Sequence, residues 1–190
     1  MEYFADYRRK LRERFGNERA DMIITEALYI ISLGTNDFLE NYFAIPTRRA
    51  HYTIDQYQDL LVDLASTFLI QLYGVGARKI SFTELPPMGC LPMERTINIF
   101  THRDCIQSYN DVALQFNDKI EFMVSQLNRN LPGMKIIYSR TVYNTLLTAI
   151  TDPASYGNHF FFFLPGDPPD VIGLFSNSDS SVNQVLKYLR

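Results

Sequence analysis

An apolar run near the start of the chain ends abruptly in small and polar residues. The stretch LYIISLGTND, residues 28–37, closes with Gly34, Thr35, Asn36 and Asp37. An asparagine amide held on a short glycine turn offers a fixed N–H donor, which can stabilise the charge that develops on a carbonyl oxygen. Asn36 is therefore a candidate oxyanion-hole donor, and Gly34 is the turn that presents it. The alternative is that Asn36 and Asp37 only cap a turn or a helix start.

No serine or histidine forms a catalytic pair with this segment. The sequence contains no Gly-x-Ser-x-Gly elbow of the kind that presents a nucleophilic serine. Its three histidines, His51, His102 and His159, are expected in loops or in the C-terminal tail, away from Asn36. Because a serine nucleophile needs a base within hydrogen-bond reach, we assign neither a nucleophile nor a base.

Motifs for cofactors and metals are weak. The Gly-Val-Gly at 74–76 precedes an expected strand instead of following one, so a helix end explains it better than a dinucleotide loop. His102, Asp104 and Cys105 are close in sequence, but three local ligands without a distant partner set favour a turn over a metal site. Neither motif therefore predicts a site for a dinucleotide or a metal.

Hydrophobic periodicity predicts the elements that position these residues. A helix over 2–15 is expected to end at Gly16, and Asn17 is expected to cap a second helix to residue 26. Residues 27–33 are expected to form a strand that is covered on both faces. The remaining predictions are a helix over 53–73 with a Thr53–Gln56 capping box and Gly74 as its stop, strands over 78–85 and 134–139, and helices over 106–127 and 141–150.

The order strand, helix, strand, helix, strand predicts right-handed crossovers and a parallel sheet, and therefore an α/β layered domain. Ligands of open parallel sheets bind outside the carboxyl ends of the strands. The Gly34 turn leaves the first strand there, and the loop ELPPMGCLP, residues 84–92, leaves the second strand at the same edge. Two polar loops at one edge predict a site.

Three segments carry a family resemblance. EALYIISLGTNDFLENYF, YGVGARKISFTELPPMGCLP and LPGMKIIYS, in this order and spacing, resemble the plant GDSL esterase/lipase family, a branch of the SGNH hydrolases. The resemblance covers residues 3–157, which predicts a partial hydrolase domain over 1–157 and a divergent tail over 158–190. It implies a flavodoxin-like, three-layer α/β/α fold and hydrolysis of ester bonds in lipids and other acyl or acetyl substrates. It also implies that no metal or organic cofactor takes part.

The resemblance also assigns roles to residues. Gly34 and Asn36 fall on the family's G-x-N-D block, whose asparagine contributes to the oxyanion hole, and Asp37 is expected to support it. The family's nucleophile belongs to a Gly-Asp-Ser block and its base to an Asp-x-x-His block, and this sequence contains neither. We therefore expect a domain truncated at both ends with little or no turnover. The alternative is a non-catalytic remnant, either a binding or interaction domain or a product without function.

Composition and charge limit the partners. The 190-residue chain has a formal net charge of −3 and is 46% hydrophobic, which suits one globular domain and argues against a nucleic-acid binder. The basic cluster YRRKLRER, residues 7–14, is expected to be a solvated helix face. No apolar run is long enough to span a bilayer. The N-terminus shows no signal-peptide pattern although the family is generally secreted, which leaves the location open.

Further predictions concern the cysteines, the tail and the sheet edge. Cys90 and Cys105 are too few for a disulfide framework, but a single bridge between them remains an option. The four phenylalanines at 160–163 favour an aggregation-prone segment over a core strand, and residues 180–190 suit a short helix. Loss of the family's first two strands would expose a sheet edge and favour self-association.

Overall fold

A computed structural model describes residues 1–98 and 104–152 of the chain. The predictions for the phenylalanine run, for the final helix, and for His102 and His159 lie outside these residues. The elements in chain order are α1 (Glu2–Phe15), α2 (Asn17–Glu26), β1 (Leu28–Ile31), η1 (Asp37–Ala44), α3 (Pro46–His51), α4 (Ile54–Gly74), β2 (Lys79–Thr83), η2 (Met88–Cys90), α5 (Pro92–Ile97), α6 (Gln107–Asn130), β3 (Lys135–Ser139) and α7 (Val142–Thr151).

The three strands form one parallel sheet in the order β1-β2-β3. β1 pairs with β2 from Leu28↔Lys79 to Ile31↔Phe82, and β2 continues the pairing with β3. Parallel pairing across the helical connections α4 and α6 is the geometry of a βαβ unit. The α/β fold class predicted from the order of elements is confirmed.

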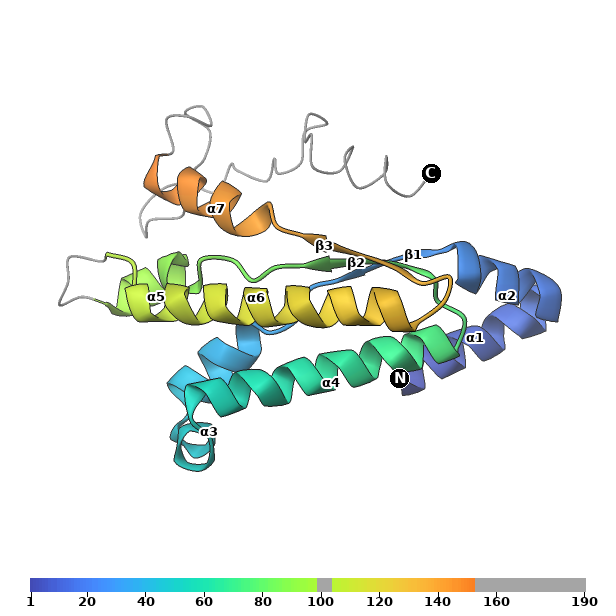
Figure 1. Ribbon diagram of the computed structural model, residues 1–190, viewed down its shortest axis with the longest axis horizontal. Helices are drawn as coiled ribbons and strands as arrows, with labels where there is room; N and C mark the ends of the chain where they lie inside the picture. The colour runs from blue at the N-terminus through green and yellow to red at the C-terminus, as the bar shows by residue number, and fades with distance from the viewer. Residues whose placement is uncertain (99–103, 153–190) are drawn as a thin grey trace.

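The hydrophobic core lies between one face of the sheet and the long helices α4 and α6. Figure 1 shows these two helices side by side beneath the strands, with α7 on the other side of the strands beyond the end of β3. Ile80 and Phe82 point into the core from β2 and are 0% and 1% exposed. Leu69 of α4 and Ile120 of α6, also almost fully buried, belong to the same cluster. Burial of such side chains is worth about 1.5–3 kcal/mol each, so this layer dominates the stability of the fold.

The prediction that the first strand is covered on both faces is wrong at Ile30. This side chain is 74% exposed, whereas its neighbour Ile31 is 8% exposed and belongs to the core. Successive side chains of a strand point to opposite faces of the sheet, and only the face of Ile31 meets α4 and α6. β1 is also an edge strand of the described sheet.

Two local predictions at the helix ends are also corrected. Asn17 does not cap α2: it is the first residue of that helix, whereas Gly16 occupies the cap position with φ 78° and ψ 166°. That conformation is accessible essentially to glycine alone. Gly16 is the single residue that connects α1 to α2. His51, expected in a loop, is the exposed last residue of α3.

Helix α4 begins as its sequence predicts. The Thr53 hydroxyl accepts a hydrogen bond from the Gln56 backbone N–H, and the Gln56 side chain accepts one from the Thr53 backbone N–H. This reciprocal pair satisfies two backbone donors that the first turn would otherwise leave open. Within residues 1–98 and 104–152, no helix is both long and apolar enough to cross a membrane.

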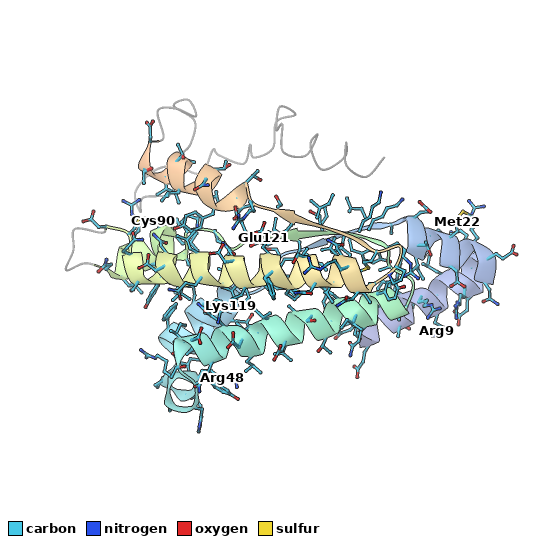
Figure 2. The ribbon with its side chains drawn as sticks, viewed as in Figure 1. Arg9, Met22, Arg48, Cys90, Lys119 and Glu121 are labelled. Atoms are coloured by element: carbon cyan, nitrogen blue, oxygen red, sulfur yellow. A yellow bond between two sulfur atoms is a disulfide. The ribbon has the colours of Figure 1, made fainter. Side chains whose placement is uncertain are left out.

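The basic cluster of α1 lies on an ion-paired helix surface. Arg9 bonds both Asp6 and Glu13 on its own helix, and Arg12 bonds Asp21 of α2 at 2.9 Å. Side-chain exposure of 37–60% in these pairs is typical of a solvated face, as predicted. Figure 2 shows Arg9 and Met22 at the end of the molecule farthest from Cys90.

Candidate active site

The turn after β1 needs glycine for its backbone conformation and leaves little space for a side chain. Gly34 is buried, with φ 117°, a conformation that L side chains rarely adopt. A Cβ at this position would lie 3.1 Å from Leu85 Cδ2 and 3.2 Å from Phe116 Cε1. Leu85 belongs to the loop that follows β2, so the two loops expected at one edge of the sheet are in contact there.

A wide helical segment follows this turn. The Phe38 backbone N–H donates to the Gly34 carbonyl at 3.0 Å, and residues Asp37–Ala44 form the π-helix η1. Phe38 is 0% exposed and packs edge-on against Phe116 and Tyr57, with ring centroids 5.1 and 5.9 Å apart. This aromatic anchor holds η1 against both α4 and α6. π-helical turns are rare and often occur at functional sites.

Asn36 lies at the start of η1 with its side chain exposed. It makes no side-chain capping hydrogen bond, because its own backbone is already helical at φ −69° and ψ −32°. A capping residue instead needs a non-helical backbone so that its side chain can reach back to the N–H groups of the first turn. Asn36 therefore occupies the N-cap position of η1 without a capping bond from its side chain, which is exposed beyond the carboxyl end of β1.

Asp37 is half-buried beside this turn. Burial raises the pKa of its carboxyl, while its own backbone N–H and the positive charge of Arg48 partly oppose the rise. The Tyr57 hydroxyl donates to the Asp37 carbonyl at 3.4 Å, which ties the segment to α4. The carboxylate is thus placed beside Asn36 in an environment that disfavours its charge.

Two asparagines of α6 hold the loop that follows β2. Asn117 Oδ1 accepts the Leu85 backbone N–H at 2.7 Å, and Asn117 Nδ2 donates to the Leu85 carbonyl at 3.1 Å. Asn110 Oδ1 accepts the Gly89 N–H at 2.8 Å, and its Nδ2 donates to Cys90 Sγ at 3.3 Å. Both asparagines are buried, so each satisfies backbone groups that have no access to water.

The far end of this loop is closed by a disulfide. Cys90 bonds Cys105, a bridge that the sequence left undecided. Gly89 lies against the chain just after Cys105: a Cβ there would come within 2.0 Å of the Ile106 carbonyl oxygen. The Ile106 N–H in turn donates to the Gly89 carbonyl at 2.9 Å. A side chain at position 89 would force these two segments apart.

Glu84 connects the same loop to α7. Its carboxylate accepts the Tyr143 backbone N–H at 2.7 Å, at the start of that helix. Burial raises the Glu84 pKa, while this hydrogen bond and the positive charge of Arg140 partly offset the rise. The residue is structural here: it satisfies an open donor of the first helical turn and complements the helix dipole.

Comparison with known proteins assigns the family. The family model described as GDSL-like Lipase/Acylhydrolase matches residues 7–163. The chain belongs to the GDSL lipase/acylhydrolase family. It is 48% identical over 157 residues to the Arabidopsis thaliana protein GDSL esterase/lipase At2g42990, and 46% identical over the same length to GDSL esterase/lipase At2g04570. Each match covers 83% of this chain and 45% of the relative, so the chain spans less than half the relatives' length.

In this GDSL-family chain, the sequence prediction missed the two loop-holding asparagines. The signal was present: Asn110 and Asn117 continue the three- and four-residue spacing of the buried positions Ala113 and Ile120. A polar residue at a core position of a helix needs a buried partner. The partners of Asn110 and Asn117 are backbone groups of a loop more than twenty residues away in the chain. Helical periodicity cannot predict such distant partners.

The structure brings together only part of the predicted chemistry. Gly34, Asp37 and the Leu85 loop converge at the carboxyl edge of the sheet, whereas His51 is exposed on α3. Cys105 is bonded to Cys90 and is no thiolate ligand. Among residues 1–98 and 104–152, no three histidine, cysteine or acidic side chains form a cluster that could hold a metal ion.

Replacing Asn117 by alanine should destabilise the fold by about 2–4 kcal/mol, because it leaves two buried backbone groups of Leu85 without partners. Urea denaturation followed by circular dichroism measures the loss. Asn130→Ala, an exposed position at the end of the same helix, is the matched control and should change stability little. Equal effects of the two substitutions would contradict the role given to Asn117.

Glu84→Gln tests the buried carboxyl, since glutamine keeps the acceptor oxygen but does not titrate. The pKa of Glu84 is higher in the folded protein than its ordinary value of 4.5 in the unfolded chain. The protonated side chain therefore stabilises the fold at pH values below 4.5, and this contribution is lost as the pH rises through the folded-state pKa. The variant should therefore gain stability relative to the parent protein between about pH 4 and pH 7. Urea midpoints at both pH values measure this, and a parallel pH dependence of parent and variant would contradict it.

Proposed function

We propose that this chain supplies the oxyanion-stabilising part of an ester hydrolase site, with Asn36 as the donor. The observation that supports this is the exposed, non-capping Asn36 amide on a rigid turn at the carboxyl edge of the sheet. The turn is rigid because Gly34 is wedged against Leu85 and Phe116, and η1 is anchored through Phe38. Preorganised donors cost no reorganisation when charge develops, which is why they stabilise a transition state.

The chemistry proposed is acyl transfer from an ester. A nucleophilic oxygen adds to the ester carbonyl carbon, and the carbonyl electron pair moves onto its oxygen. That oxyanion accepts a hydrogen bond from Asn36 Nδ2 while the attacking hydroxyl loses its proton. When the oxyanion collapses, the carbonyl re-forms, the bond to the alkoxide breaks, and the alkoxide takes up that proton and leaves as the alcohol. The substrate is a lipid or another acyl or acetyl ester. Asp37 is proposed to support the turn and not to react, since its surroundings disfavour its charge.

A second candidate function is a binding or interaction domain without catalysis. The observation that favours it is that the 190 residues contain neither a Gly-Asp-Ser nor an Asp-x-x-His block. A triad lacking its nucleophile or base loses nearly all of its rate advantage. A fluorophosphonate that labels activated serines separates the two candidates. We expect no labelling of this 190-residue chain, and labelling would show that it carries an activated serine of its own.

The Asn36 role is testable in a chimera in which residues 7–163 of this chain replace the matching segment of At2g42990. The flanking segments of that relative are expected to supply the Gly-Asp-Ser and Asp-x-x-His blocks. Asn36→Ala should lower kcat on p-nitrophenyl butyrate about 10²–10³-fold, as loss of one oxyanion donor does. Fluorophosphonate labelling should persist, because the nucleophile stays in place.

Asn41→Ala is the matched control in the same chimera, since Asn41 is another exposed asparagine of the η1 segment. It should leave kcat within about twofold of the parent chimera, because exposed substitutions away from a site have small effects. An unchanged kcat in Asn36→Ala would remove Asn36 from the oxyanion hole.

We also propose that copies of this chain self-associate through the β1 edge. β1 is an edge strand of the described sheet, and Ile30 on it is 74% exposed. An open edge presents unpaired backbone N–H and C=O groups to another strand. Sedimentation velocity over a wide concentration range should show concentration-dependent oligomers that Ile30→Lys suppresses. Ile97→Lys, at a 60% exposed position of α5, should not suppress them, and equal behaviour of both variants would contradict edge pairing.

A further inference from the structure

The two cysteines of the Cys90–Cys105 disulfide differ in exposure. Cys90 is 1% exposed at the end of η2, whereas Cys105 is partly exposed just before α6. Figure 2 shows Cys90 where α5 lies beside the start of α6. A thiol opens a disulfide by attacking one of its sulfurs, so access decides which sulfur is attacked. In the folded chain, Cys105 presents the sulfur that a small thiol can reach.

A buried amide identifies the sulfur that leaves. Asn110 Nδ2 donates a hydrogen bond to Cys90 Sγ at 3.3 Å. The orientation of this amide is fixed, because Asn110 Oδ1 accepts the Gly89 N–H at 2.8 Å and therefore cannot face the sulfur. Hydrogen-bond donors stabilise the charged form of a thiol. Negative charge that develops on Cys90 Sγ thus meets a donor that is already in place.

We propose that this disulfide is a site of reversible exchange with low-molecular-weight thiols, attacked at Cys105 and released at Cys90. The thiolate of the small molecule forms a bond to Cys105 Sγ while the Cys90–Cys105 bond breaks, and the electron pair of that bond goes to Cys90 Sγ. The Cys90 thiolate can attack Cys105 Sγ again, which expels the small thiol and restores the bridge. Alternatively, a second small thiol removes the first as its own disulfide, and the two cysteine thiolates take up protons.

Contacts around the bridge hold the two segments together when the sulfurs part. The Ile106 N–H donates to the Gly89 carbonyl at 2.9 Å, and Asn117 binds both backbone groups of Leu85. These hydrogen bonds do not involve the sulfurs, so the open form keeps Cys90 close to its partner and closes again readily. The exchange is independent of the function proposed for Asn36, because it needs neither that residue nor an ester.

The test treats the folded 190-residue chain with 2-mercaptoethanol at pH 8, followed by an acid quench, alkylation of free thiols and digestion with trypsin. Arg95 and Arg103 lie between the cysteines, so mass spectrometry finds them on separate peptides. The adduct on Cys105 should exceed the adduct on Cys90 about tenfold, because only one sulfur is accessible. In urea the unfolded chain exposes both sulfurs, and the two adducts should form in similar amounts.

Asn110→Asp tests the donor to the leaving sulfur. Aspartate keeps an acceptor for the Gly89 N–H but replaces the donor to Cys90 Sγ by a second oxygen. A hydrogen bond to a charged group changes its protonation equilibrium about ten- to a hundredfold. About half of such a change, on a logarithmic scale, appears in the rate of exchange. The variant should therefore exchange about three- to tenfold more slowly than the parent chain.

Asn117→Asp is the matched control, because it makes the same chemical change on the same helix. It keeps an acceptor for the Leu85 N–H and loses only the donor to the Leu85 carbonyl, so it should not slow the exchange. Circular dichroism checks that both variants fold, and the position of the adduct in the parent chain tests the proposal without any variant. The proposal is overturned if the folded chain does not react or if the two cysteines carry equal adduct. It is also overturned if a folded Asn110→Asp variant exchanges as fast as the parent chain.

Discussion

The close approach of Gly34 to Leu85 and Phe116 is the constraint on which the rest of this site depends. It joins the turn after β1 to the loop after β2 and to helix α6, and a Cβ at Gly34 would lie only 3.1–3.2 Å from the side chains of Leu85 and Phe116. Because Gly34 has positive φ, any other residue there would strain the backbone, and its Cβ would also crowd Leu85 and Phe116. The turn that presents Asn36 is thereby held by packing, while the asparagine itself is left exposed.

Helix α6 serves the loop after β2 as a second rigid support. Asn117 and Asn110, which lie two turns apart on the helix, bind the loop backbone at Leu85 and Gly89. The Cys90–Cys105 disulfide then closes the far end of this loop. Such bonds satisfy buried backbone groups and also fix their position to within hydrogen-bond tolerance. Rigid elements hold site residues more accurately than free loops do.

Buried acids carry a cost in the same region. Burial raises the pKa of both Asp37 and Glu84, so each is less stable as a carboxylate than it would be in water. The charged form of Glu84 is partly stabilised by its hydrogen bond to the start of α7, and the charged form of Asp37 is partly stabilised by the positive charge of Arg48. Raised carboxyl pKa values gather at functional sites, but Glu84 shows that burial of a structural carboxyl raises its pKa as well, even where a hydrogen bond to a helix start partly offsets the rise.

Local sequence determined the elements of this protein, and tertiary contacts decided the site. The spacing of apolar residues predicted α4, α6 and the three parallel strands, and the Thr53–Gln56 pair marked the start of α4, because these depend on neighbours within one or two turns. The strings G-T-N-D and LPPMGC indicated the family and the edge of the sheet. They did not show that the Asn36 side chain makes no capping hydrogen bond or that Ile30 is exposed. Nor did they show that Asn110 and Asn117 hold the loop after β2. Each of these depends on which residues distant in the chain pack together, and a local pattern carries no information about that.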